Sequence, residues 1–174
     1  SGEIGFKEYL EKVDVYCNNG LDSGYEGDLK TEVECVEAAK AVYAICLNES
    51  LSKHGQDIGT EQVIIENLAN ILIYAYVGDS TLSRVIQNKD LYVQKNQVVP
   101  ELCAKVYTAE QGIRVMEYAN KILNSIYDGE IPKELESKFA KLSKRLSLST
   151  DTIGLKKIIG EKVVEAGGYP VQSF

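Results

Sequence analysis

The chain has 174 residues, of which 44% are hydrophobic and 26% are charged, and its formal net charge is −7. A chain of this length buries roughly 70% of the surface that it exposes when unfolded, which fits one globular domain with a real core. The acidic balance argues against a nucleic-acid or anionic-membrane partner, because both require clustered lysine and arginine. The basic run at 141–145 is short and follows two glutamates, so we interpret it as a solvated helix face.

Apolar residues recur at helical spacing along the chain, without convincing strand alternation or an internal repeat, so the sequence predicts an all-α protein. A first helix is expected over about 4–17, and a linker with three glycines follows at 18–28. We therefore divide the chain into an N-terminal helix with its linker (1–28) and a helical bundle domain (29–174). The expected inner face of the first helix consists of Phe6, Tyr9, Leu10, Val13, Tyr16 and Cys17.

The second helix is expected to start near Thr31, which has the capping-box spacing with Glu34, and to stop at Gly55. Thr60 is the predicted cap of a third helix that continues to about Asn88. A polar segment, "NKDLYVQKNQ", then separates the third helix from the fourth.

Proline and glycine mark the remaining helices. Pro100 lies near the first turn of a predicted fourth helix, which ends at Asp128-Gly129. Pro132 marks the start of a predicted fifth helix. Asp151 or Thr152 opens a last helix, which Gly167-Gly168 and Pro170 end. The fifth helix places Leu135, Phe139, Leu142 and Leu146 on its inner face, and the last helix carries Ile153, Ile158, Ile159, Val163 and Val164. Long helices joined by short turns predict an up-and-down bundle of about five to six helices.

The middle of the third predicted helix is apolar on every side, with no formal charge between Asn67 and Gly78. This stretch is too short for a membrane span, which needs about 20 residues. A helix that is apolar all round is expected at the centre of a bundle, covered by neighbours on several sides. Five tyrosines also occur at core-facing spacing and are expected to contribute packing: Tyr43, Tyr74, Tyr76, Tyr107 and Tyr118.

The four cysteines form no C-x-x-C pair, and we predict buried free thiols in a reducing compartment, the cytoplasm. They are Cys17, Cys35, Cys46 and Cys103. The N-terminal residues lack the basic and apolar regions of a secretory signal peptide.

The residue content predicts no catalytic, cofactor-binding or metal-binding site in this chain. A di-iron bundle needs two Glu-x-x-His motifs, whereas this chain has one histidine, His54, preceded three positions earlier by Leu51. The Cys and His spacings do not fit a zinc site, and no glycine-rich phosphate loop follows a strand. We expect His54, at the end of a helix beside Gly55, to interact with the terminal carbonyls.

Polar residues interrupt the apolar helix at 79–84. Buried carboxylates with shifted pKa values can be catalytic, but the i,i+4 spacing of Ser80 and Arg84 favours a structural polar network that fixes helix register. Asp79 is expected to pair with Ser83 or with a basic group on another helix. The candidate network is therefore Asp79, Ser80, Ser83 and Arg84.

The stretch "KHGQDIGTEQVIIENLANILIYAYVGDSTLSR" (53–84) resembles the C-terminal helical extension of very-long-chain-type acyl-CoA dehydrogenases. The resemblance rests on Lys53-His54-Gly55, Glu61-Gln62, Leu68-Ala69, Ile71 or Ile73 with Tyr74 or Tyr76, and Leu82-Ser83-Arg84. The neighbouring helices "ECVEAAKAVYAICLNESLSK" and "ELCAKVYTAEQGIRVMEYANKIL" and the end "GGYPVQSF" extend it over about residues 30–174. Family members usually have small or apolar residues where this chain has Gly78-Asp79-Ser80.

The resemblance implies an accessory domain that packs on an upstream dehydrogenase core and contributes to dimerisation with a second copy. The parent enzyme would bind FAD and desaturate fatty acyl-CoA in β-oxidation, with electrons passing to an electron-transferring flavoprotein. The family's catalytic and flavin-binding motifs belong to that core, so none of them is transferred to a residue of this chain.

Two other functions stay open on the sequence alone. A freestanding helical adaptor would offer a groove to a partner helix. A bundle that binds a fatty acyl chain would need an unfilled apolar cavity.

Overall fold

The structure is a computed structural model that describes residues 2–20 and 23–168. Over these residues the protein is all-α, as predicted, with seven α-helices, one short 3₁₀ helix and no strand. The elements are α1 (Gly2–Asn19), α2 (Lys30–His54), η1 (Gly55–Thr60), α3 (Gln62–Gln87), α4 (Lys89–Gln94), α5 (Val99–Tyr127), α6 (Lys133–Leu146) and α7 (Thr152–Ala166).

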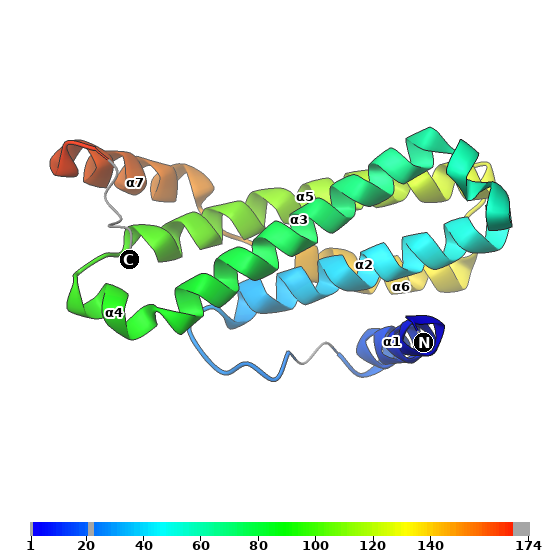
Figure 1. Cartoon of the computed structure of the whole chain (residues 1–174), viewed down its shortest axis with the longest axis horizontal. Coiled ribbons are helices and arrows are strands. Elements are labelled where there is room, and N and C mark those ends of the chain that lie inside the picture. Colours follow the sequence, from blue (N-terminus) through cyan, green and yellow to red (C-terminus); the bar gives the residue numbers. More distant parts are fainter. Residues whose placement is uncertain (1, 21–22, 169–174) are drawn as a thin grey trace.

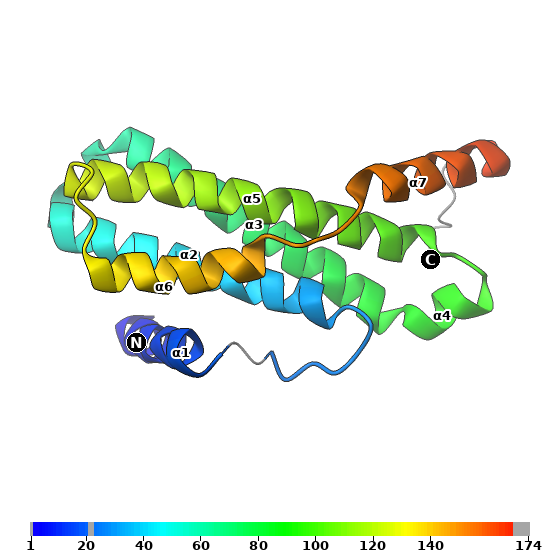
Figure 2. The same cartoon turned by 180° about the vertical axis from the view of Figure 1, so that it is seen from behind.

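Four helices form the body of the up-and-down bundle (Figure 1). Helices α2 and α5 lie side by side, with α3 packed across one face of this pair and α6 across the other, as the two opposite views show (Figures 1 and 2). Helix α1 lies under α2 and α6, whereas α7 rests on α5 and projects beyond one end of the bundle (Figure 2).

The core lies where α2, α3, α5 and α6 meet. Helix α2 contributes a row of buried small side chains, which lets its neighbours approach closely: Ala38, Ala39, Ala41 and Ala44. Helix α6 turns its predicted inner face to the core, and Leu135, Phe139, Leu142 and Leu146 are all buried. In α1, Val13 and Cys17 are buried, so the predicted inner face of the first helix is also confirmed.

Most of the helix ends agree with their sequence signals. Helix α2 ends before Gly55, which has a φ of 54°, and α5 ends at Asp128, which has the left-handed conformation. Pro100 lies in the first turn of α5 and Pro132 directly precedes α6. The Asp151 side chain accepts a hydrogen bond from the backbone N–H of Gly154 and caps α7. Pro170 lies outside the described residues.

Two predicted caps are wrong. Helix α2 begins after Leu29 without a side-chain cap, because the Glu34 carboxylate accepts a hydrogen bond from Arg145 on α6 and the capping box does not form. Helix α3 begins after Glu61, since the Thr60 hydroxyl donates to the carbonyl of Asp57 within η1. The polar segment expected between the third and fourth helices contains the short helix α4.

Helix α3 is not covered on all sides, which corrects the expectation drawn from its apolar middle. One side, including Ile71 and Ala75, is buried against α2 and α5. The opposite side is exposed, and Tyr76, expected to face the core, is 70% exposed. Among the described helices, none combines the length and the hydropathy that crossing a bilayer requires.

Candidate interface

The four residues of the predicted polar network do not form one cluster. The Lys40 ammonium on α2 donates to the Asp79 carboxylate at 2.9 Å and to Glu37 on its own helix at 2.7 Å. Ser80, Ser83 and Arg84 are exposed on α3. Within the described residues, no side-chain hydrogen bond or ion pair joins these three to Asp79. The Asp79 carboxylate therefore helps to set the register between α2 and α3.

The single histidine, His54, lies at the junction of α2 and α3. Its Nδ1 atom is 3.7 Å from a carboxylate oxygen of Glu61, and its Nε2 atom is buried without a hydrogen-bond partner within the described structure. The expected contact with the terminal carbonyls of α2 is therefore replaced by an acidic neighbour. Among residues 2–20 and 23–168, no group of three or more histidine, cysteine, aspartate or glutamate side chains is arranged to hold a metal ion.

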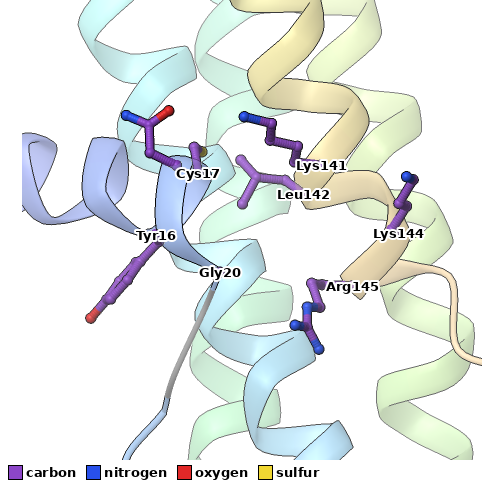
Figure 3. A pocket seen from close by; sticks show the side chains of 8 residues that line it. Tyr16, Cys17, Gly20, Lys141, Leu142, Lys144 and Arg145 are labelled. Carbon is purple, nitrogen blue, oxygen red and sulfur yellow. The ribbon is translucent and has the colours of Figure 1, made fainter.

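A concave site of about 470 Å³ lies between the end of α1 and the end of α6. Lys141, Lys144 and Arg145 line it, but these three side chains point in different directions rather than toward one point (Figure 3). Arg145 also donates to Glu34 on α2 at 2.5 Å. Lys144 and Arg145 lie in the last turn of α6, where basic side chains interact favourably with the helix dipole.

The Cys17 thiol forms part of the same wall (Figure 3). Burial raises the pKa of Cys17 above its ordinary value, against the opposing effect of Lys138. A thiol that stays protonated is a weak nucleophile, because the thiolate is the reactive form. The lining of this concave site thus offers no activated nucleophile.

Three of the four cysteines are buried as predicted, whereas Cys103 is exposed, which corrects the expectation for that residue. Burial also raises the pKa of Cys35 to about 12 and raises the pKa of Cys46. We expect the thiol reagent DTNB to modify one thiol per folded chain at pH 8, and four after denaturation in guanidinium.

Replacing Cys103 with serine should remove the reactive thiol and leave the other three protected. Modification of two or more thiols in the folded chain at the fast rate would contradict the burial of Cys17, Cys35 and Cys46.

The exposed side of α3 carries a group of apolar side chains in two adjacent rows along the helix. The first row contains Ile65, Ala69, Leu72 and Tyr76 and is called the α3 seam. The second contains Ile73 and Val77 and is called the α5-side patch.

The two rows adjoin each other on the helix, because Ala69 and Ile73 are i,i+4 neighbours. Successive residues of an α-helix are about 100° apart, so Leu72 and Ile73 point in different directions. The seam lies on the side of α3 toward α2, because Asp79, three residues after Tyr76, contacts Lys40 of that helix. The second row lies toward α5, since Tyr74 stacks on Tyr118 of α5 with ring centroids 5.9 Å apart.

Aromatic and basic groups border the α5-side patch. The Lys121 ammonium lies 5.2 Å from the centroid of the Tyr118 ring, a cation–π contact. Hydrogen bonding with Tyr118, followed by hydrogen bonding with Arg114, lowers the pKa of Tyr74. Tyrosine and arginine beside an apolar patch are typical of the residues that dominate protein–protein interfaces.

Two neighbouring positions of α3 thus have opposite environments. The exposed fractions are 54% for Ile73 and 36% for Val77, compared with 0% for Ile71. The stretch without formal charge in the sequence was the available signal for this surface. Periodicity did not separate its buried from its exposed residues, because both sets are apolar.

Comparison with known proteins identifies the family to which this chain belongs. The sequence model of the family described as acyl-CoA dehydrogenase, C-terminal domain, matches residues 38–139. One similar solved structure is an acyl-CoA dehydrogenase from Bacillus anthracis in complex with FAD, with a TM-score of 0.81 at 20% sequence identity. The alignment covers 98% of this chain and 28% of that chain. At this identity the likeness shows a common fold. No curated protein gives a significant match.

Proposed function

Because the chain belongs to the acyl-CoA dehydrogenase C-terminal domain family, we propose that it is the helical accessory domain of an FAD-dependent acyl-CoA dehydrogenase. In the proposed enzyme a base removes the α proton of a fatty acyl-CoA, and FAD accepts the β hydrogen as hydride. This reaction belongs to the dehydrogenase core and not to the residues of this chain. The very-long-chain subtype, the role in fatty acid β-oxidation and the cytoplasmic location are parts of the same proposal.

The likeness to the Bacillus anthracis enzyme supports a modular role. The chain spans about 28% of that longer chain, so its counterpart there is one part of a larger enzyme. The partners that we propose are a dehydrogenase core and a second copy of the chain. The core supplies the active site, and this domain supplies a rigid helical surface that packs on it.

The observation that carries the proposal is the α5-side patch. Ile73 and Val77 are exposed on α3, and the Tyr74–Tyr118 pair joins this side of α3 to α5. Burial of apolar surface stabilises a complex by roughly 25 cal/mol per Å² before the costs of association. We propose that the core covers this patch.

Binding to a separately produced dehydrogenase core tests the proposal. The core is taken from the gene that encodes this chain or, where the two are encoded apart, from the same genome, and it is purified with FAD bound. Calorimetry should detect a complex with this chain. The double variant Ile73→Glu with Val77→Glu should weaken binding at least tenfold, because it places two charges in an apolar contact.

Val164→Glu is the matched control, since Val164 is 81% exposed on α7 and lies outside the patch. It should bind the core as the unmodified chain does. Absence of binding by the unmodified chain to any dehydrogenase core of the genome would refute the proposal. Stable monomeric behaviour with a different protein partner would favour the adaptor function instead.

A further inference from the structure

The C-terminal end of α1 carries the one asparagine of the sequence that is followed by glycine. Asn19 is the last residue of the helix, and Gly20 follows it with a φ of 91°. Both residues are exposed. An asparagine side chain reacts with the backbone most readily before glycine, because no Cβ atom then hinders the approach of the next amide nitrogen to its carbonyl carbon.

The Asn19 carboxamide is not held by other groups of the protein. The carboxamides of Asn67 and Asn88 donate hydrogen bonds to backbone carbonyls, at 2.6 and 2.8 Å. In the part of the chain that the structure describes, the Asn19 carboxamide forms no hydrogen bond. Its carbonyl carbon is therefore open to attack, and only the position of the attacking nitrogen limits the reaction.

That nitrogen is held in the last turn of α1. The Gly20 N–H donates to the Tyr16 carbonyl at 3.0 Å, and an N–H in this bond is not free to lose its proton. Asn18 and Asn19, which follow the buried Cys17 in the helix, are both exposed, so no buried side chain fixes the end of this turn. Helix ends open at little cost in free energy, and such opening releases the Gly20 N–H.

We propose that Asn19 is a site of spontaneous deamidation, at a rate set by the opening of the last turn of α1. The Gly20 nitrogen gives its proton to hydroxide and forms a bond to Cγ of Asn19. The bond from Cγ to the carboxamide nitrogen breaks, and ammonia leaves. Water then opens the resulting cyclic imide: attack at Cγ gives aspartate, and attack at the backbone carbonyl carbon gives isoaspartate. No group is oxidised or reduced.

The reaction changes both the charge and the backbone at this end of α1. Each product adds one negative charge to the formal net charge of −7, at a helix C-terminus, where negative charge is unfavourable. Isoaspartate also lengthens the main chain by a methylene group, which displaces the Gly20 N–H from the Tyr16 carbonyl. Asn18 and Gly20 line the concave site between α1 and α6, so the new carboxylate arises at the edge of that site. This chemistry is independent of the proposed function.

Incubation of the purified, folded chain in mildly alkaline water enriched in heavy oxygen tests the proposal. Peptide mapping in ordinary water should then find aspartate and isoaspartate at position 19, each with one heavy oxygen atom. Conversion during digestion adds no heavy oxygen and is recognised in this way. Asn18 is the internal control, because it is exposed in the same turn but precedes an asparagine. Conversion of Asn19 should exceed conversion of Asn18 at least tenfold.

Two variants identify the reacting side chain by anion exchange. Asn19→Gln should abolish the acidic species that accumulates in the unmodified chain, because glutamine has to close a larger ring. Asn18→Gln, the matched control, should leave its accumulation unchanged. Equal conversion of Asn18 and Asn19, or no heavy oxygen at position 19 of the folded chain, would overturn the proposal.

Unfolding tests the role of the last turn of α1. Position 19 should react faster in guanidinium, because the Gly20 N–H is then released from the Tyr16 carbonyl. An equal rate in the folded and the unfolded chain would show that this hydrogen bond does not control the reaction and would refute that part of the proposal.

Discussion

Replacing Ile71 with alanine should lower the free energy of unfolding by about 3 to 4 kcal/mol, which is within the range for large-to-small substitutions in cores. Ile71 is fully buried in the principal core between α2, α3 and α5. The substitution removes three buried carbon atoms and leaves a cavity that rigid helices fill incompletely. Urea unfolding followed by circular dichroism should show a lower midpoint with an unchanged m value.

Ile73→Ala is the matched control because the residue type, helix and substitution are the same. Ile73 is 54% exposed, so its free energy of unfolding should change by no more than about 0.5 kcal/mol. Similar losses in the two variants would contradict the assigned orientation of α3.

Gly112→Ala should lower the free energy of unfolding by about 2 kcal/mol. A Cβ atom at position 112 of α5 would lie 2.2 Å from the backbone carbonyl oxygen of Leu146 and 3.2 Å from the Cys35 sulfur. The end of α6 has to shift, at a cost of about 3 kcal/mol, which exceeds the roughly 1 kcal/mol that alanine gains over glycine in a helix. The thermal midpoint should therefore fall by about 4 to 8 °C.

Gly160→Ala separates the steric effect from the helix propensity. Gly160 is also helical, in α7, and a Cβ atom there meets nothing within 4 Å. Its thermal midpoint should stay the same or rise slightly. A midpoint for Gly112→Ala that is equal to or above that of the unmodified chain would show that α6 does not approach α5 as closely as described.

Gly55 and Gly112 also show how far local sequence rules extend. Gly55 and Asp128 adopt conformations with positive φ, and the sequence located both as helix ends because the requirement is local. Gly112 lies in the middle of a helix, where no local signal explains it. A side chain at this position would clash with the backbone carbonyl of Leu146 on α6. Only the packing of α5 against α6 therefore explains the glycine.

The capping box predicted for α2 failed for a similar reason. Thr31 and Glu34 have a favourable spacing, but Glu34 is recruited by Arg145, which lies 111 positions later in the sequence. An ion pair between two helices competes with a cap within one helix. The spacing of residues in the sequence does not show which of these two interactions forms. The division of the chain at residue 28 stays a prediction, although α1 packs on α2 and α6 and buries Val13 and Cys17.

The sequence by itself determined the helical class, the order of the long helices, several of their ends and the inner face of α6. These properties depend on periodicity and on turn residues, which act over a few positions. Tertiary structure decided which side of the apolar α3 is buried, because Ile71 and Ile73 are chemically identical and differ only in their neighbours. It also decided that Asp79 pairs with Lys40 and that Ile73 and Tyr76 stay exposed, since both depend on contacts between helices distant in sequence.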